Sequence, residues 1–185
     1  MMNQLIVKAR RTLRGKTLMT ACAVAGAVAL PQIVHVAGAA LGVGNSLGTL
    51  LLPMHFFVFL AGLLGGPAVG LFTGFCAPVV SFLLSGMPVV TTLPLMTVEL
   101  IGYGLVAGLL FRARIPAFFK LLTAQLGGRL LRFAVTLAAV AGGLSTASPV
   151  AVWTAVVTGL PGIVLQWVFI SLLAGRLGKE DGELH

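Results

Sequence analysis

Charged side chains are scarce in this sequence, and acidic ones are the scarcest. Only 9% of the 185 residues are charged, with four Asp and Glu against twelve Lys and Arg, whereas a soluble domain carries roughly a quarter charged residues. Hydrophobic residues make up 58% of the chain, and its mean hydropathy is +1.09. These features exclude a soluble domain and predict an all-α membrane protein, because a helix that crosses the bilayer needs about 20 apolar residues.

Several motifs for chemistry are also missing. The sequence has no glycine-rich phosphate loop for ATP, no His-Glu-x-x-His zinc motif and no Gly-x-Ser-x-Gly nucleophile motif. Its two cysteines, Cys22 and Cys76, lie within apolar runs, without the spacing of metal ligands or of a secretory disulfide framework. We therefore predict a protein that is not an enzyme and that has no cofactor and no metal site. The net charge of +8 does not indicate nucleic acid, because no basic residue alternates with aromatics, and contact with the lipid bilayer explains it better.

The basic residues set the predicted topology. Their positions fit six spans, at about 17–37, 47–65, 67–86, 90–111, 117–143 and 150–175. All twelve Lys and Arg then fall at one face, which the positive-inside rule makes cytoplasmic, whereas five or seven spans would divide them. The prediction is a basic N-terminal segment (1–16), one six-helix transmembrane bundle (17–176) and a short tail (177–185), in a bacterial inner membrane with both termini cytoplasmic.

Two parts of this topology need a further assumption. Arg129 and Arg132 lie far along the fifth apolar run, so we expect an amphipathic interfacial segment over 115–128 and a span that begins near Leu130. The basic start followed by an apolar run also resembles a cleavable signal peptide. We disfavour that alternative, because a polytopic chain needs no separate export signal and cleavage would leave an odd number of spans.

Glu99 is the single acidic residue within the apolar runs, since the other three lie at positions 180–183. An ionisable group in hydrocarbon costs about 3 kcal/mol on insertion scales and faces protein or water, so Glu99 is a candidate for substrate binding. Tyr103 follows it one helical turn later on the same side. The alternative is a protonated or hydrogen-bonded carboxyl group with a structural role only.

Other polar residues gather near the outer ends of the predicted spans. Gln32 and His35 share a face of the first helix if that helix continues past its internal proline. Pro53 fits the first turn of a helix, so the second helix is predicted to begin there, after an outer loop or re-entrant segment, with His55 in its first turn. Each histidine taken singly fits an interfacial hydrogen bond. Together with Gln32 and Glu99 they converge at one level, as the few polar groups of a binding pocket do.

Small residues recur every four positions along several predicted spans. The first span carries Ala21, Ala25 and Ala29, with Ala23 and Ala27 in a neighbouring row. Rows of this kind let helices approach closely in lipid. Both packing within the bundle and docking of a partner protein stay open for the alanines. Packing is predicted for the glycine rows, at positions 62, 66, 70, 74, 104 and 108.

A set of short motifs resembles a known family. Pro-Gln-x-x-His, Leu-Pro-Met-His, Pro-x-x-Ser and Met-Pro occur in order between positions 31 and 88, and Glu-Leu-x-x-Tyr-Gly follows at 99–104. The combination resembles the substrate-binding S components of energy-coupling-factor (ECF) vitamin transporters, over about residues 17–111 in motifs and beyond that in hydropathy and length. The resemblance implies six transmembrane helices with both termini inside. It also implies binding of a vitamin-like small organic micronutrient on the outer side, and association with a transmembrane T subunit and two ATPase subunits.

The resemblance further implies roles for individual residues. A pocket built from the first outer loop and the later helices would use the matching positions Asn45, His55, Glu99 and Tyr103. An Ala-x-x-x-Ala face on the first helix, which docks the T subunit in that family, corresponds to Ala21, Ala25 and Ala29. The sixth span also carries Gln166 and Trp167, which we expect to lie deeper than the pocket.

Two other classes of protein stay open. The first is a membrane scaffold or assembly protein in which Glu99 only bonds neighbouring helices. The second is an intramembrane enzyme that uses Glu99 with a histidine, which we disfavour because no nucleophile or metal set accompanies them. One carboxylate and two imidazoles fit pantothenate-like, pyrimidine-like and corrin solutes alike.

Overall fold

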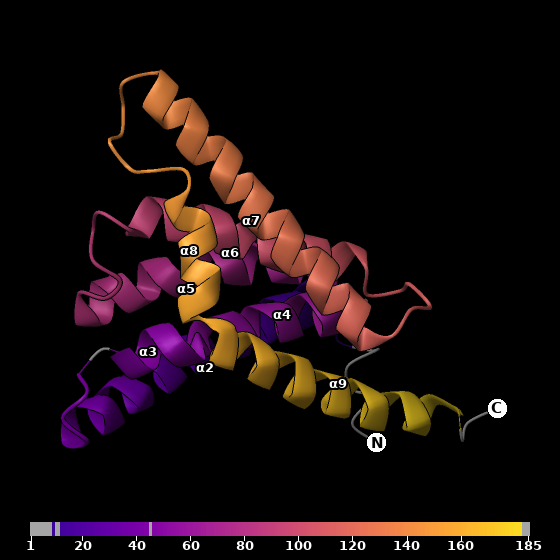
Figure 1. Ribbon diagram of the computed structural model, residues 1–185. Coiled ribbons are helices and arrows are strands. Elements are labelled where there is room, and N and C mark those ends of the chain that lie inside the picture. The colour runs from indigo at the N-terminus through magenta and orange to yellow at the C-terminus, as the bar shows by residue number, and fades with distance from the viewer. Residues whose placement is uncertain (1–8, 10–11, 45, 183–185) are drawn as a thin grey trace.

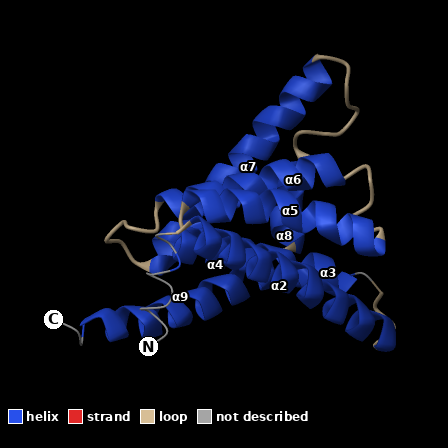
Figure 2. Cartoon of the chain, turned by 180° about the vertical axis from the view of Figure 1, so that it is seen from behind, coloured by secondary structure: helices blue, strands red, loops and turns tan. Residues whose placement is uncertain are grey.

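The computed structural model describes residues 9, 12–44 and 46–182, with side chains described up to residue 173. Within this part the chain is all-α and forms no strand. The helices are α2 (Leu13–Ala40), α3 (Ser46–Leu51), α4 (Pro53–Gly65), α5 (Pro67–Ser85), α6 (Leu93–Leu109), α7 (Ala117–Ala141), α8 (Ala151–Thr158) and α9 (Leu160–Gly182). In Figures 1 and 2, α4, α5 and α6 pack side by side in the middle of the molecule, and the C-terminal half of α7 extends away from them.

Several helices have the length and composition of membrane spans. Three segments qualify, namely Leu13–Ala40, Ser46–Gly65 and Pro67–Ser85. A fourth qualifies if Ala151–Thr158 and Leu160–Leu173, which meet at a bend of 65°, form one broken span. Of the remaining helices, α6 is apolar but has 17 residues, and α7 carries three basic side chains. These apolar helices indicate a multi-pass membrane protein, in agreement with the sequence.

The break before α4 shows how the local sequence sets the fold near the candidate site. α4 begins at Pro53, as predicted, because proline suits the first turn, where its missing N–H is not needed. Leu52 before it adopts a left-handed conformation (φ 49°), which ends the preceding helix. The segment before Pro53 is not entirely loop, however, since residues Ser46–Leu51 form the short helix α3.

Glycines allow the central helices to touch backbone to backbone. A Cβ on Gly104 of α6 would lie 2.1 Å from the carbonyl oxygen of Gly70 on α5, and a Cβ on Gly62 of α4 would lie 2.6 Å from that of Gly104. The predicted packing role is therefore confirmed for these three glycines. Gly66 has a different role, since its positive φ of 88° forms the turn between α4 and α5.

Replacing Gly104 by alanine is expected to destabilise the bundle. The added methyl group collides with backbone, which cannot rotate away, so α5 and α6 must separate; overpacking of this kind costs about 1–3 kcal/mol. Unfolding in mixed micelles measures the loss. The control is Gly142→Ala at the end of α7, where the nearest atom to the new Cβ is 3.3 Å away. Equal stability of the two variants would contradict the close contact of α5 with α6.

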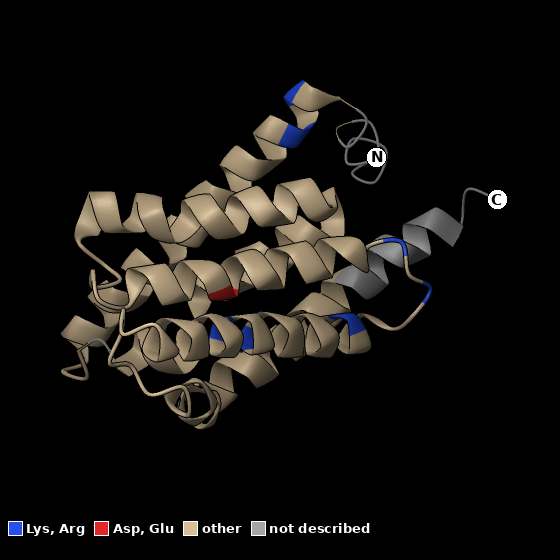
Figure 3. Cartoon of the chain, turned by 90° about the horizontal axis from the view of Figure 1, so that it is seen from above, with Lys and Arg blue, Asp and Glu red and all other residues tan. Residues whose placement is uncertain are grey.

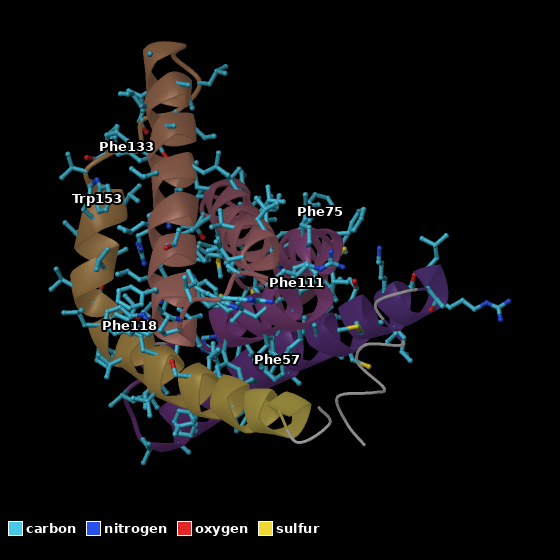
Figure 4. The ribbon with its side chains drawn as sticks, turned by 90° about the vertical axis from the view of Figure 1, so that its right-hand side faces the viewer. Phe57, Phe75, Phe111, Phe118, Phe133 and Trp153 are labelled. Atoms are coloured by element: carbon cyan, nitrogen blue, oxygen red, sulfur yellow. The ribbon has the colours of Figure 1, made fainter. Side chains whose placement is uncertain are left out.

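Aromatic contacts fix the later helices. The rings of Phe133 on α7 and Trp153 on α8 lie 6.3 Å apart, and Figure 4 shows them side by side between these helices. Phe118 at the start of α7 lies 4.9 Å from the ring of Trp167 on α9. Through these contacts α7 is held against α8 at one level and against α9 at another.

Candidate functional site

A buried cluster of charges lies at the middle of the bundle. Glu99 on α6 is 2% exposed, and its carboxylate accepts hydrogen bonds from the Tyr103 hydroxyl and from Nη1 of Arg132, the latter at 2.5 Å. Arg132 bonds the carboxylate oxygen Oε2, whereas the Tyr103 hydroxyl bonds Oε1. Nη1 of Arg129 lies 3.4 Å from Oε1 and also donates to the carbonyl oxygen of Val152 on α8 at 2.9 Å. Figure 3 shows this red position facing blue positions on the neighbouring helix. Glu99 is thus an ion-pair partner of two arginines rather than an isolated carboxylate.

The positions of Arg129 and Arg132 correct the sequence analysis, which placed both at the cytoplasmic edge. α7 is one continuous helix from Ala117 to Ala141, and both arginines lie on it beside Glu99. Their spacing of three residues puts them on one helix face, which turns toward α6. The signal in the sequence was this arginine pair inside an apolar run together with a lone glutamate elsewhere, because buried charges in a membrane protein pair with one another.

A cavity of about 330 Å³ opens beside this cluster. Seven helices, α2 to α8, and the α5–α6 connection contribute to its wall, which contains His35 from α2, His55 from α4, Glu99 from α6 and both arginines from α7. Proline and methionine side chains form much of the remainder. An apolar cavity with a few convergent polar groups is the usual form of a small-molecule site.

Three buried polar atoms of residues that line this cavity have no hydrogen-bond partner within the described part of the chain. They are Nδ1 of His35, Nδ1 of His55 and Nε of Arg132. Leaving such an atom unpaired away from water costs about 1–3 kcal/mol, so native proteins rarely do so without a reason. Each of the three has less than 1 Å² of accessible surface, so neighbouring side chains enclose these atoms and they are not open to the cavity.

The predicted site residues divide into three groups. His35, His55 and Glu99 line the cavity, and Tyr103 is buried next to Glu99 and donates to it. Gln32 lies on α2, which does continue past Pro31. Its side-chain amide donates a hydrogen bond to the Ser85 hydroxyl at 2.9 Å, and the residue is not part of the cavity wall. Asn45 lies outside the described residues.

Gln166 and Trp167 form a separate polar chain that sequence reasoning placed below the pocket. The Trp167 indole donates to Gln125 at 2.9 Å, the Gln125 amide donates to Gln166 at 3.2 Å, and the Gln166 amide donates to the carbonyl of Leu52 at 3.2 Å. This chain ties α9 and α7 to the break before α4. It therefore supports the residues next to the cavity without lining it.

The predicted docking face lies on the outside of α2. Ala21, Ala25 and Ala29 are exposed, and they line a surface groove of about 930 Å³ between α2 and α5. In the neighbouring row, Ala27 is fully buried in the core. The two rows therefore face in different directions, one toward the bundle and one away from it.

Comparison with known proteins gives no match: no family model, curated protein or solved structure is similar to this chain. Among the described residues, no group of three or more His, Cys, Asp or Glu side chains is placed to hold a metal ion. The arrangement in the cavity is suited to binding, since it offers guanidinium and imidazole groups.

Proposed function

We propose that this protein is the substrate-binding subunit of an ECF-type importer, which captures a small organic micronutrient on the outer face of a bacterial inner membrane. The observation that carries the proposal is the cavity within the apolar helices, lined by Glu99, two arginines and two histidines. A scaffold would benefit from the ion pairs alone, but it has no use for a cavity beside them.

The charge distribution supports six spans with both termini cytoplasmic. Every predicted span coincides with helix, since α3 with α4 and α8 with α9 each occupy one of them. In Figure 3 the blue positions, other than those facing Glu99, lie toward the right-hand side of the view. That distribution agrees with the positive-inside rule, even after Arg129 and Arg132 are removed from the count.

The exposed alanine row supports a protein partner. A row of small side chains permits close approach of another helix, and in this proposal the partner is the transmembrane T subunit, which works with two ATPase subunits. The chain itself carries no ATP-binding loop, so the energy for uptake comes from those partners.

Two measurements on material from native membranes test the proposal. The tagged full chain should co-purify with ATPase subunits, and mass spectrometry of the denatured protein should release one small organic molecule in near-stoichiometric amount. A scaffold gives neither result. An enzyme gives turnover of the molecule, without the ATPases. Either of these two patterns would overturn the proposal.

A further inference from the structure

The charges around the cavity do not balance. Arg129 and Arg132 share the single carboxylate of Glu99. The other three acidic residues of the chain lie at positions 180–183, whereas α9 begins beside Leu52 and residue 180 is about 30 Å along it. Among the described side chains, one guanidinium group at the cavity therefore has no carboxylate of its own.

Arg132 is the more exposed of the two arginines. Nη1 of Arg129 is engaged by both Glu99 and the carbonyl of Val152, and the Arg129 side chain is 7% exposed. The Arg132 side chain is 21% exposed and lines the cavity; its Nη1 bonds Glu99 and its Nε is buried, so the exposed part is the rest of the side chain. A guanidinium group presents its N–H groups in a planar fork that matches a carboxylate.

The remaining wall limits the size and polarity of the occupant. A volume of about 330 Å³ is at the lower end of the range of about 300–1,000 Å³ found for ligand sites. Pro31, Met54 and Met96 supply apolar wall, while His35 and His55 add two imidazole rings. The cavity is therefore suited to a small molecule with an apolar body and few polar groups, and it is too small for a corrin.

We infer that the solute bound in this cavity is a small organic anion, whose carboxylate pairs with Arg132 and whose apolar body lies against the proline and methionine side chains. Binding then balances two guanidinium groups with two carboxylates. A cationic solute would add a third positive charge beside the arginines, and a neutral one would leave the imbalance unchanged. This inference deepens the proposed function and rests on it.

Matched pairs of small molecules test the charge preference on the purified full chain in detergent. The probes are pantothenate with panthenol, biotin with biotinamide, and nicotinate with nicotinamide, together with thiamine as a cation. At least one carboxylate should bind about tenfold or more tightly than its neutral partner by titration calorimetry. Tighter binding of a neutral member or of thiamine would overturn the inference, as would binding of no carboxylate at all.

Substitution of Arg132 assigns the preference to this side chain. Arg132→Gln should weaken binding of the preferred carboxylate about 10- to 100-fold, the loss expected for one charge-assisted hydrogen bond, and should leave the neutral partner unaffected. Glu99 keeps Arg129 as its counter-charge in this variant, so the fold is retained. Arg132→Lys retains the charge without the fork and should give an intermediate affinity. The control is Arg114→Gln, at an exposed position outside the cavity, which should bind the carboxylate with the affinity of the parent protein. Equal affinities for all variants would contradict the role of Arg132.

The test of the carboxylate preference can fail independently of the test of the importer function. Carboxylate preference without co-purifying ATPases would refute the importer assignment and leave the ligand chemistry standing. Co-purifying ATPases together with a neutral or cationic bound solute would refute the ligand chemistry alone.

Discussion

Glu99→Gln is expected to lower the free energy of unfolding by about 3–5 kcal/mol, because removal of one partner from a buried ion pair leaves the other charge uncompensated. Here the loss affects two guanidinium groups at once, since Arg129 and Arg132 both face this carboxylate. The glutamine retains one oxygen that accepts a hydrogen bond but carries no charge. Unfolding in mixed micelles, followed by circular dichroism, measures the change.

Two comparisons make this expectation specific to the ion pairs. Glu180→Gln removes the same charge near the C-terminal end of α9 and should change stability by less than about 0.5 kcal/mol. The double variant Glu99→Gln with Arg132→Gln should recover part of the loss, because only one guanidinium group then lacks a partner. Additive losses in the double variant would show that the two side chains are not coupled.

The cluster also predicts an asymmetry between its members. Removal of Arg132 leaves a one-to-one pair between Arg129 and Glu99, whereas removal of Glu99 leaves two positive charges. Substitution of Arg132 should therefore change the stability of the protein little and the binding of a solute strongly. We expect the reverse for Glu99. Its carboxylate already has Tyr103 and both arginines as partners, so we expect it to act on a solute mainly by orienting Arg132.

Much of the helix pattern could be predicted from the sequence. Pro53 and Pro67 each start a helix where a proline is favourable, and apolar runs of about 20 residues give the long helices. The pairing of Arg132 with Glu99 could not be read in this way, because it depends on α7 packing against α6 across 33 positions of sequence. The positive-inside rule counts charges by their distance from span ends and contains no information about such contacts. It therefore assigned the two arginines to the cytoplasmic face.

The helix α3, where the sequence analysis expected a loop or re-entrant segment, also depends on contacts between distant parts of the chain. Residues 46–51 form a helical turn against α2, where Gly48 faces the ring of His35 closely enough that a Cβ would lie 2.8 Å from it. A six-residue helix has no periodic signal of its own and forms because of this packing. The consequence for the site is that α3 contributes Gly48 and Thr49 to the cavity wall.

One helix carries both proposed activities. The N-terminal part of α2 presents Ala21, Ala25 and Ala29 to the outside, and its C-terminal part contributes Pro31 and His35 to the cavity. Ala25 and His35 are ten residues apart, or about 15 Å along the helix. Docking and binding are thus on the same rigid element but at positions far enough apart to be altered separately.

Ala25→Leu is accordingly expected to abolish uptake while leaving solute binding unchanged. The larger side chain projects from an exposed row of small residues and would prevent close approach of the T subunit that we propose as the partner. It does not reach the cavity wall. Uptake into cells that express the complete transporter should fall to background, and the variant should no longer co-purify with the T and ATPase subunits, whereas calorimetry on the isolated chain should give the parent affinity. Ala138→Leu, at an exposed alanine of α7, provides the matched control and should retain uptake. A purified complex that keeps the T subunit in spite of Ala25→Leu would show that docking uses another face.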